Sequence, residues 1–185
     1  MFKSKSLYSN DVMIDIETCS TKNNAKILSI AAVRFNILND KIKTYEKEWL
    51  IKDETDEDIK SKFDVSNETI EWWNSQPEEI RNYAFTKEPR INLKEALLEL
   101  NDFIIGCNRF WAQGINFDPI VLEHAYNVYN IKPEWKYYQW RDSRTLIKCI
   151  YEFLPKNTLG GHNALNDCKF QIKLLHDTIS QLKIN

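Results

Sequence analysis

The chain is poor in the residues that build flexible linkers. It has only 4 glycines and 5 prolines among 185 residues, so we expect one folded domain spanning residues 1–185. Hydrophobic residues make up 43% of the chain and aromatic residues 12%, which argues against disorder. A chain of this length can bury enough surface to fold without disulfides or a structural metal.

Long apolar runs and paired cysteines are also missing. No segment approaches the roughly 20 apolar residues that a membrane-spanning helix needs, and the first ten residues, MFKSKSLYSN, lack the apolar core of a signal peptide. The 4 cysteines are scattered without a C-x-x-C pair, and the chain has only 3 histidines. We therefore expect free thiols, no structural zinc, no membrane contact and a cytoplasmic location.

An excess of positive charge is absent as well. The chain has 25 Lys and Arg residues against 27 Asp and Glu residues, a formal net charge of −2. Proteins that hold long duplex DNA through its phosphates usually carry a basic excess, so a repressor or a packaging protein is disfavoured. An enzyme that binds a few nucleotides, with metal ions neutralising the phosphate, agrees with this balance.

Hydrophobic periodicity predicts strands at the front of the chain, followed by alternating helices and strands. The expected strands are 12–16, 27–37, 41–51, 109–113 and 135–140. The expected helices run from a cap at Ser66 to residue 73, over 77–83, over 93–105, from a cap at Asn116 to residue 129, from Asp142 to about residue 151, and over 163–182. Residues 52–62 and 155–161 are expected to be loops. This order favours a mixed sheet with helices packed on it.

Two acids end the first predicted strand. Asp15 and Glu17, in VMIDIET, are two residues apart, so both side chains leave the same face of the sheet. Like charges at this spacing repel each other unless cations lie between them, and carboxylate oxygens suit Mg²⁺ or Mn²⁺. A solvated strand end would show the same pair, so the pair alone does not decide.

Three further residues follow later elements. Asp118, in WAQGINFDPIVL, lies at a predicted helix start, where the helix dipole alone would favour an acid. His162 and Asp167, in GGHNALNDC, open the last helix. Their five-residue gap is about 140° around an ideal helix, so they would not share a face. The two glycines predict that His162 lies in a mobile loop, with Asp167 one turn into the helix.

In combination these residues resemble the DEDD exonuclease superfamily, in its histidine-bearing, DnaQ-like (DEDDh) branch. The resemblance runs from residue 11 to about residue 175, through IDIET, ILSIAAVRFN, EWWNSQ, FWAQGINFDPIVLEHAY, WRDSRTL and HNALNDCKFQ. Within the branch, the chain is similar to phage exonuclease A, exonuclease VIII-like proteins and Rv2179c-like exoribonucleases. The resemblance implies a ribonuclease H-like α/β fold: a five-stranded mixed sheet with one antiparallel strand and helices on both faces.

The resemblance also implies the chemistry. A 3′-5′ exonuclease of this kind would release nucleoside 5′-monophosphates from single-stranded nucleic acid by a two-metal mechanism. Asp15, Glu17 and Asp167 would hold one Mg²⁺ or Mn²⁺ ion. Asp15 would bridge to a second ion with the help of Asp118. His162 would be the general base, because imidazole exchanges a proton near neutral pH.

Aromatic residues near these motifs are candidates for base stacking. Trp72 and Trp73 are neighbours in a predicted helix and point about 100° apart, so we expect one in the core and the other facing the substrate. Phe117, beside Asp118, is a further stacking candidate. Trp111 lies in the middle of a predicted strand and is expected in the core.

Two arginines flank an acid in WRDSRT. Arg141 and Arg144 are candidates for a phosphate contact, and we interpret Asp142 as a structural helix cap. The remaining histidines, His124 and His176, are expected to be surface or packing residues, because the role of general base already has a better-placed candidate.

Alternatives to this interpretation stay open at the level of sequence. Single-stranded DNA is favoured as substrate, with trimming of RNA 3′ ends as the alternative, since no motif reports the 2′-hydroxyl. An inactive nucleic-acid or partner-binding module on the same fold is a different class, and a ribonuclease H-like endonuclease would not need His162. Relatives are often homodimers, and the aromatic content is compatible with an interface.

Overall fold

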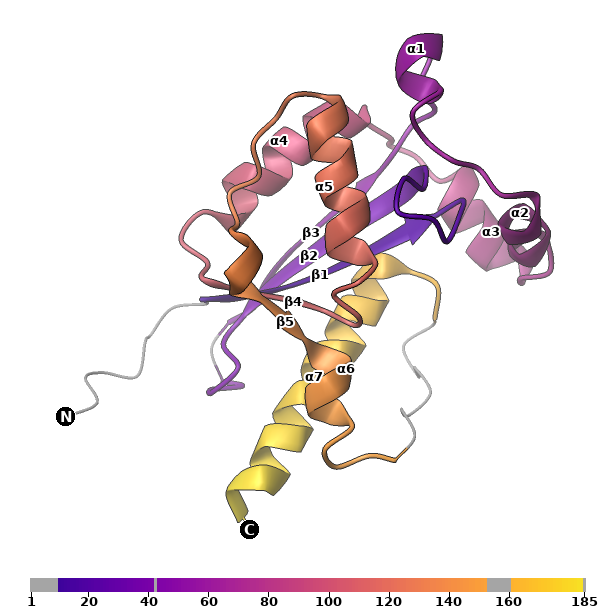
Figure 1. The fold of residues 1–185 in the computed structure, drawn as a ribbon. Helices are drawn as coiled ribbons and strands as arrows, with labels where there is room; N and C mark the ends of the chain where they lie inside the picture. Colours follow the sequence, from indigo (N-terminus) through magenta and orange to yellow (C-terminus); the bar gives the residue numbers. More distant parts are fainter. Residues whose placement is uncertain (1–9, 42, 153–160, 185) are drawn as a thin grey trace.

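The sheet of the expected fold is present. The structure, a computed structural model, describes residues 10–41, 43–152 and 161–184. These residues form a five-stranded sheet of order β3-β2-β1-β4-β5 (Figure 1). The strands are β1 (Asp11–Thr18), β2 (Ile27–Phe35), β3 (Tyr45–Leu50), β4 (Arg109–Ala112) and β5 (Trp140–Asp142). Because β2 is antiparallel to both neighbours and β1, β4 and β5 are parallel, the mixed sheet with one antiparallel strand is confirmed.

Helices cover both faces of this sheet (Figure 1). Side chains of β1 alternate between the faces: Val12, Ile14 and Ile16 pack in a cluster with α4 (Leu93–Ile104) and α5 (Asp118–Val128). Met13 packs on the other face with α6 (Ser143–Ile147) and α7 (Ala164–Ile184). By the same alternation, Asp15 and Glu17 belong to the α7 face.

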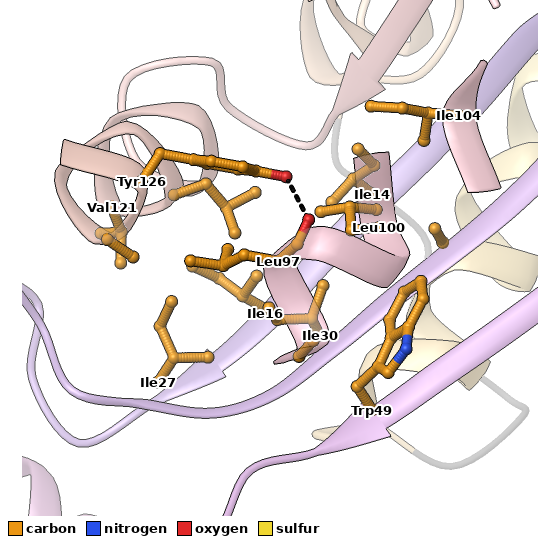
Figure 2. Packing of buried hydrophobic residues seen from close by; sticks show 14 of the residues in the cluster. Ile14, Ile16, Ile27, Ile30, Trp49, Leu97, Leu100, Ile104, Val121 and Tyr126 are labelled. Carbon is orange, nitrogen blue, oxygen red and sulfur yellow. Dashed lines mark hydrogen bonds between the residues drawn. The ribbon is translucent and has the colours of Figure 1, made fainter. Parts of the chain in front are cut away.

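The larger core lies between the sheet and helices α4 and α5. Figure 2 shows Leu97 and Leu100 of α4 against Ile14 and Ile30 of the sheet. The hydroxyl of Tyr126 on α5 donates a 3.0 Å hydrogen bond to the Leu97 carbonyl, so this buried polar group is satisfied. The core therefore fixes the position of α5, whose first residue is Asp118, relative to β1.

A buried ion pair holds the start of β1. Asp11 is completely buried and accepts two 2.6 Å hydrogen bonds from the Arg109 guanidinium. It also accepts from the indole N–H of Trp111 at 2.9 Å and the backbone N–H of Ile37 at 3.0 Å. Since these donors come from β4 and from the chain after β2, Asp11 ties three strands together. The expectation that Trp111 lies in the core is confirmed, with 6% of its surface exposed.

Three short helices lie beyond the carboxyl end of β1: α1 (Glu57–Lys60), α2 (Asn67–Asn74) and α3 (Glu78–Phe85) (Figure 1). The prediction of a loop over residues 52–62 was wrong for α1. Asp56 caps this single turn by accepting from the backbone N–H groups of Asp58 and Ile59. The hydrogen bonds to the cap residue, rather than an apolar stripe, stabilise this turn, so hydrophobic periodicity could not predict it.

Several predicted boundaries also differ. The strand expected over 135–140 is instead a 3₁₀ helix, η1 (Tyr137–Gln139), and β5 begins at Trp140, because the Gln139 side chain accepts from the Lys136 backbone N–H at 2.8 Å and closes a turn. Asn116 does not cap α5, since Phe117 occupies the cap position. The helix expected to reach residue 151 ends at Ile147, and β3 begins at Tyr45 rather than residue 41.

The remaining predicted segments have simpler outcomes. The helix expected over 163–182 is confirmed as α7. Residue 42 and most of the loop expected over 155–161 lie outside the described residues. Within the part of the chain that is described, no helix is both long and apolar enough to cross a bilayer.

Candidate active site

Two acids of the site come from the end of β1. Asp15 pairs with Ala31 of β2 and Glu17 with Ser29, and the register then shifts, so that Thr18 pairs with Ile27. Such irregularities increase the local twist and re-aim side chains, and they recur beside active sites. The two carboxylates thus leave the same face of β1 just before the register shifts.

The third acid comes from the first turn of α7. Asn163 caps this helix, because its side chain accepts from the backbone N–H of Asn166 at 2.9 Å. The Asp167 carboxylate accepts in return from the backbone N–H of Asn163 at 3.2 Å. This reciprocal capping fixes the acid one turn into the helix. Oxygens of Asp15, Glu17 and Asp167 lie within 4.8 Å of one another.

The fourth acid, Asp118, reaches the same place from the start of α5. It is 7% exposed, and its Oδ1 accepts from the backbone N–H of Ile16 at 3.3 Å. Ile16 lies between the two acids of β1, so this hydrogen bond ties α5 to the strand at the site. Four carboxylates that are up to 152 residues apart in the sequence, from Asp15 to Asp167, therefore meet at one edge of the sheet.

The acids raise one another's pKa values. Burial raises the pKa of Asp15 well above its ordinary value, and three neighbouring charges raise it further, those of Asp118, Glu17 and Asp167. A hydrogen bond from the Gln171 side chain acts in the opposite direction. Asp15 thus has three carboxylate neighbours, an environment that disfavours its charged form unless cations are bound.

The neighbouring acids show the same effect. Burial, followed by the charges of Asp167 and Asp118, raises the pKa of Glu17 to about 8. Burial also raises the pKa of Asp118 to about 7, although the Ile16 N–H and the Arg144 charge oppose this. Buried and half-buried carboxylates that repel one another in this way are stabilised by cations, and a donor set made of oxygen suits hard divalent ions. The residues present therefore fit a magnesium or manganese site.

His162 lies at the rim of the site, exposed to solvent. Its backbone φ of 63° is in the left-handed region, which is unusual for a residue other than glycine and recurs at functional sites. The imidazole packs edge-on against Trp72, with ring centroids 4.6 Å apart, and lies 6.4 Å from the ring of Trp73. The aromatic pair therefore orients the histidine.

A cleft adjoins the acids. Its volume is about 410 Å³, and Glu17, Trp72, Trp73 and Phe117 are among the residues that line it. Trp73 is 1% exposed and its indole donates to the Thr18 carbonyl at 2.9 Å, whereas Trp72 is 40% exposed. The expectation of one core and one outward-facing tryptophan is confirmed. Trp72 and Phe117 thus present ring surface beside the acids.

The two arginine candidates differ in what their guanidinium groups contact. The Arg144 guanidinium donates to the Gln113 carbonyl at 3.0 Å, and its charge partly opposes the raised pKa of Asp118, so it lies near this acid of the site. Arg141 donates to the carbonyls of Tyr138 and Trp140 at 2.7 and 2.8 Å, so its guanidinium turns back to its own segment. Only Arg144 is placed near an acid of the site by these contacts.

Asp142 and the other two histidines have structural roles, as expected. Asp142 caps α6, accepting from the Arg144 backbone N–H at 3.0 Å. A ring nitrogen of His124 lies 2.9 Å from the Lys62 carbonyl oxygen, and one of His176 lies 2.9 Å from that of Asn36.

Two residues near the acids escaped the sequence reasoning. Gln171 on α7 donates from Nε2 to Asp15 Oδ1 at 2.9 Å; its spacing of four from Asp167 was the one available signal. Glu48 on β3 pairs with Ala31, which pairs with Asp15, and its charge contributes to the raised pKa of Glu17. Nothing in the sequence indicates that Glu48, Ala31 and Asp15 lie side by side, because the register between strands is set by the folded sheet.

Comparison with known proteins identifies the family of the chain. The profile of the family described as the 3′-5′ exoribonuclease Rv2179c-like domain matches residues 10–179. The chain belongs to the Rv2179c-like domain family. An exodeoxyribonuclease of Enterobacteria phage T4 is 25% identical over 204 residues, which covers 89% of this chain and 87% of the phage protein.

Solved structures agree on the fold. The nuclease domain of 3′hExo, a DEDDh family member bound to rAMP, matches with a TM-score of 0.60 and 16% identity over 96% of this chain and 95% of that one. Exonuclease X in complex with 5′ overhanging duplex DNA matches with a TM-score of 0.55 and 15% identity over 92% of both chains. The RNase domain of yeast Pop2 matches with a TM-score of 0.57 and 14% identity over 96% of this chain and 79% of that one.

The family defines the class of enzyme. This member of the Rv2179c-like family is a 3′-5′ exonuclease, as its motifs implied, and it shares the fold of the nuclease domain of 3′hExo, a DEDDh family member. The chain presents an acidic cluster, formed by Asp15, Glu17 and Asp167, that could hold a metal ion.

Proposed function

We propose that this exonuclease removes nucleoside 5′-monophosphates from the 3′ end of single-stranded nucleic acid, with DNA as the preferred substrate. One observation carries the proposal: Asp15, Glu17 and Asp167 place carboxylate oxygens within 4.8 Å of one another, and Asp118 is hydrogen-bonded to the strand between the first two. An acidic site of this kind suits phosphodiester hydrolysis, in which charge develops on the attacking and leaving oxygens.

The four acids would bind two metal ions in two groups. Asp15, Glu17 and Asp167 would hold one divalent cation, and Asp15 together with Asp118 would hold a second. When bound, a pair of divalent cations supplies electrostatic stabilisation to the attacking and leaving oxygens. The hydrogen bonds that Asp118 and Asp167 accept from backbone N–H groups orient both side chains before any ligand arrives.

The other residues act on water and substrate. His162 takes the proton from the attacking water, and its packing against Trp72 limits the orientations of the ring. The terminal nucleotide lies in the cleft beside Glu17, where Trp72 and Phe117 offer ring faces to its base. Arg144 contacts a phosphate. Arg141 remains a weaker candidate for such a contact, because carbonyls of its own segment already engage its guanidinium.

The preference for DNA rests on the T4 relative, which is an exodeoxyribonuclease and aligns with most of this chain. RNA is the second candidate, because the family description refers to an exoribonuclease and the 3′hExo domain was solved with rAMP. The same acids would serve either sugar, so the choice depends on contacts to the 2′ position.

Matched oligonucleotides test the proposal. DNA and RNA strands of the same sequence, labelled at the 5′ end, are incubated with Mg²⁺ or Mn²⁺, and the products are followed over time. We expect a ladder that shortens from the 3′ end, release of 5′-monophosphates, faster loss of DNA and no cleavage of circular single strands. Asp15→Asn should abolish all of it. Cleavage of the circle would indicate an endonuclease, and no metal-dependent cleavage of any strand would indicate a binding module.

The oligomeric state needs a separate measurement. A homodimer, which the resemblance implies, stays a prediction. Sedimentation equilibrium would test it, with a mass twice that of the 22.0 kDa chain expected and a monomer mass contradicting it.

A further inference from the structure

A buried glutamine contacts the central acid of the site. Gln171 lies one helical turn after Asp167 on α7, so both side chains leave the same face of the helix toward β1. It is 3% exposed, and its Nε2 donates to Oδ1 of Asp15 at 2.9 Å. The helix therefore delivers two side chains to the site: one carboxylate, and one amide that holds another carboxylate.

The orientation of this amide is determined by its partner. When Asp15 is ionised, as a metal ligand is, a reversed amide would place its carbonyl oxygen against the carboxylate, and two acceptors would repel each other. The N–H group therefore faces Asp15. Its carbonyl oxygen, Oε1, is buried with no hydrogen-bond partner in the described part of the chain. Burying an unsatisfied carbonyl costs about 1–3 kcal/mol, so packing alone gives no reason for a glutamine here.

The acids differ in how they are held. Asp118 and Asp167 accept from backbone N–H groups, those of Ile16 and Asn163. These donors belong to the fold and cannot be removed by mutation of a side chain. The donor to Asp15 is a side chain, so its contribution can be measured by substitution.

We propose that Gln171 is a positioning residue for Asp15: it fixes the rotation of this carboxylate so that the remaining oxygen lone pairs face the other acids and the cations they hold. The inference rests on the proposed role of Asp15 as a metal ligand. Residues that orient metal ligands in this way typically change metal affinity by about 10- to 100-fold when they are removed.

The test compares two substitutions on the same helix. Gln171→Met keeps the length of the side chain and removes the donor. Thr178→Val is the matched control, because Thr178 is also fully buried on α7, seven residues later, and its hydroxyl has no partner among the described residues. Mn²⁺ binding is measured by titration calorimetry in the absence of substrate, and thermal unfolding is measured in EDTA.

We expect Mn²⁺ to bind Gln171→Met roughly 10-fold more weakly than the wild type, and Thr178→Val to bind it unchanged. Wild-type affinity in a folded Gln171→Met would overturn the inference, even if its unfolding temperature fell, because that pattern describes a purely structural glutamine. If Gln171→Met does not fold, Gln171→Asn, which is polar but too short to reach Asp15, takes its place with the same expected result. Failure of the wild type itself to bind Mn²⁺ would instead contradict the proposed function.

Discussion

Substitution of Asp167 by asparagine should stabilise the metal-free protein while it removes activity. The three clustered carboxylates lie within 4.8 Å of one another. Two full charges at that distance repel by about 3.5 kcal/mol at an effective dielectric constant of about 20. Burial and neighbouring charges raise the pKa of Glu17 to about 8, so this carboxyl is partly protonated near neutral pH and the repulsion that Asp167 adds is smaller than the full-charge value. We expect a net relief on the order of 1 kcal/mol, which raises the unfolding temperature by roughly 2–4 °C in a chain of this size.

Asparagine keeps an oxygen that can accept from the Asn163 N–H, so the cap of α7 survives the change. Thermal unfolding in EDTA at pH 8 measures the stabilisation, and cleavage of a 3′-labelled strand with Mn²⁺ measures the loss of activity. Asp177→Asn, at an exposed position of the same helix, is the control and should change neither. A metal-free Asp167→Asn protein that is no more stable than the wild type would refute the reasoning, because the acids would not then be repelling one another.

Three other predictions follow from the same geometry. His162→Ala should slow turnover by roughly two to four orders of magnitude and leave Mn²⁺ binding unchanged in calorimetry; an equal loss of metal affinity would contradict its role as base. The pKa of Glu17 is raised from 4.5 to about 8 in the folded protein, and that of Asp118 from 3.8 to about 7. In EDTA, the folded state therefore binds more protons than the unfolded state at pH values between the ordinary and the raised pKa of each acid. Stability should therefore fall as pH rises through this window, and an unfolding temperature that is flat across it would argue against the raised pKa values. Asp11→Ala strands the Arg109 guanidinium without its buried partner, so urea unfolding should show a loss of roughly 3–5 kcal/mol, and a loss below 1 kcal/mol would contradict the part given to this ion pair.

Most of the architecture could be predicted because local patterns and global fold agree. The two-residue spacing that places Asp15 and Glu17 on one face of β1 is readable in the sequence, and so is the 3.6-residue period of α4. The acids were found because each closes or opens an element: Asp15 ends a strand signal, and Asp118 begins a helix. The resemblance to a known superfamily then joined residues that spacing alone could not connect.

What the sequence could not report depends on contacts between distant segments. Glu48 lies in line with Asp15 only because β2 and β3 pair in one particular register, and a shift of one residue would turn it to the other face. Gln171 differs from any other polar residue of a helix only through its hydrogen bond to a strand 156 positions away. Helix α1 and the 3₁₀ turn before β5 depend on side-chain caps rather than on an apolar stripe, so periodicity missed both.

A crystal structure with Mn²⁺, in which anomalous scattering locates the metal, tests the role of the four acids most directly. Two manganese peaks are expected at the edge of the sheet, one among Asp15, Glu17 and Asp167, and one shared by Asp15 and Asp118. Manganese bound elsewhere, or a single peak that leaves Asp118 without a metal contact, would contradict it.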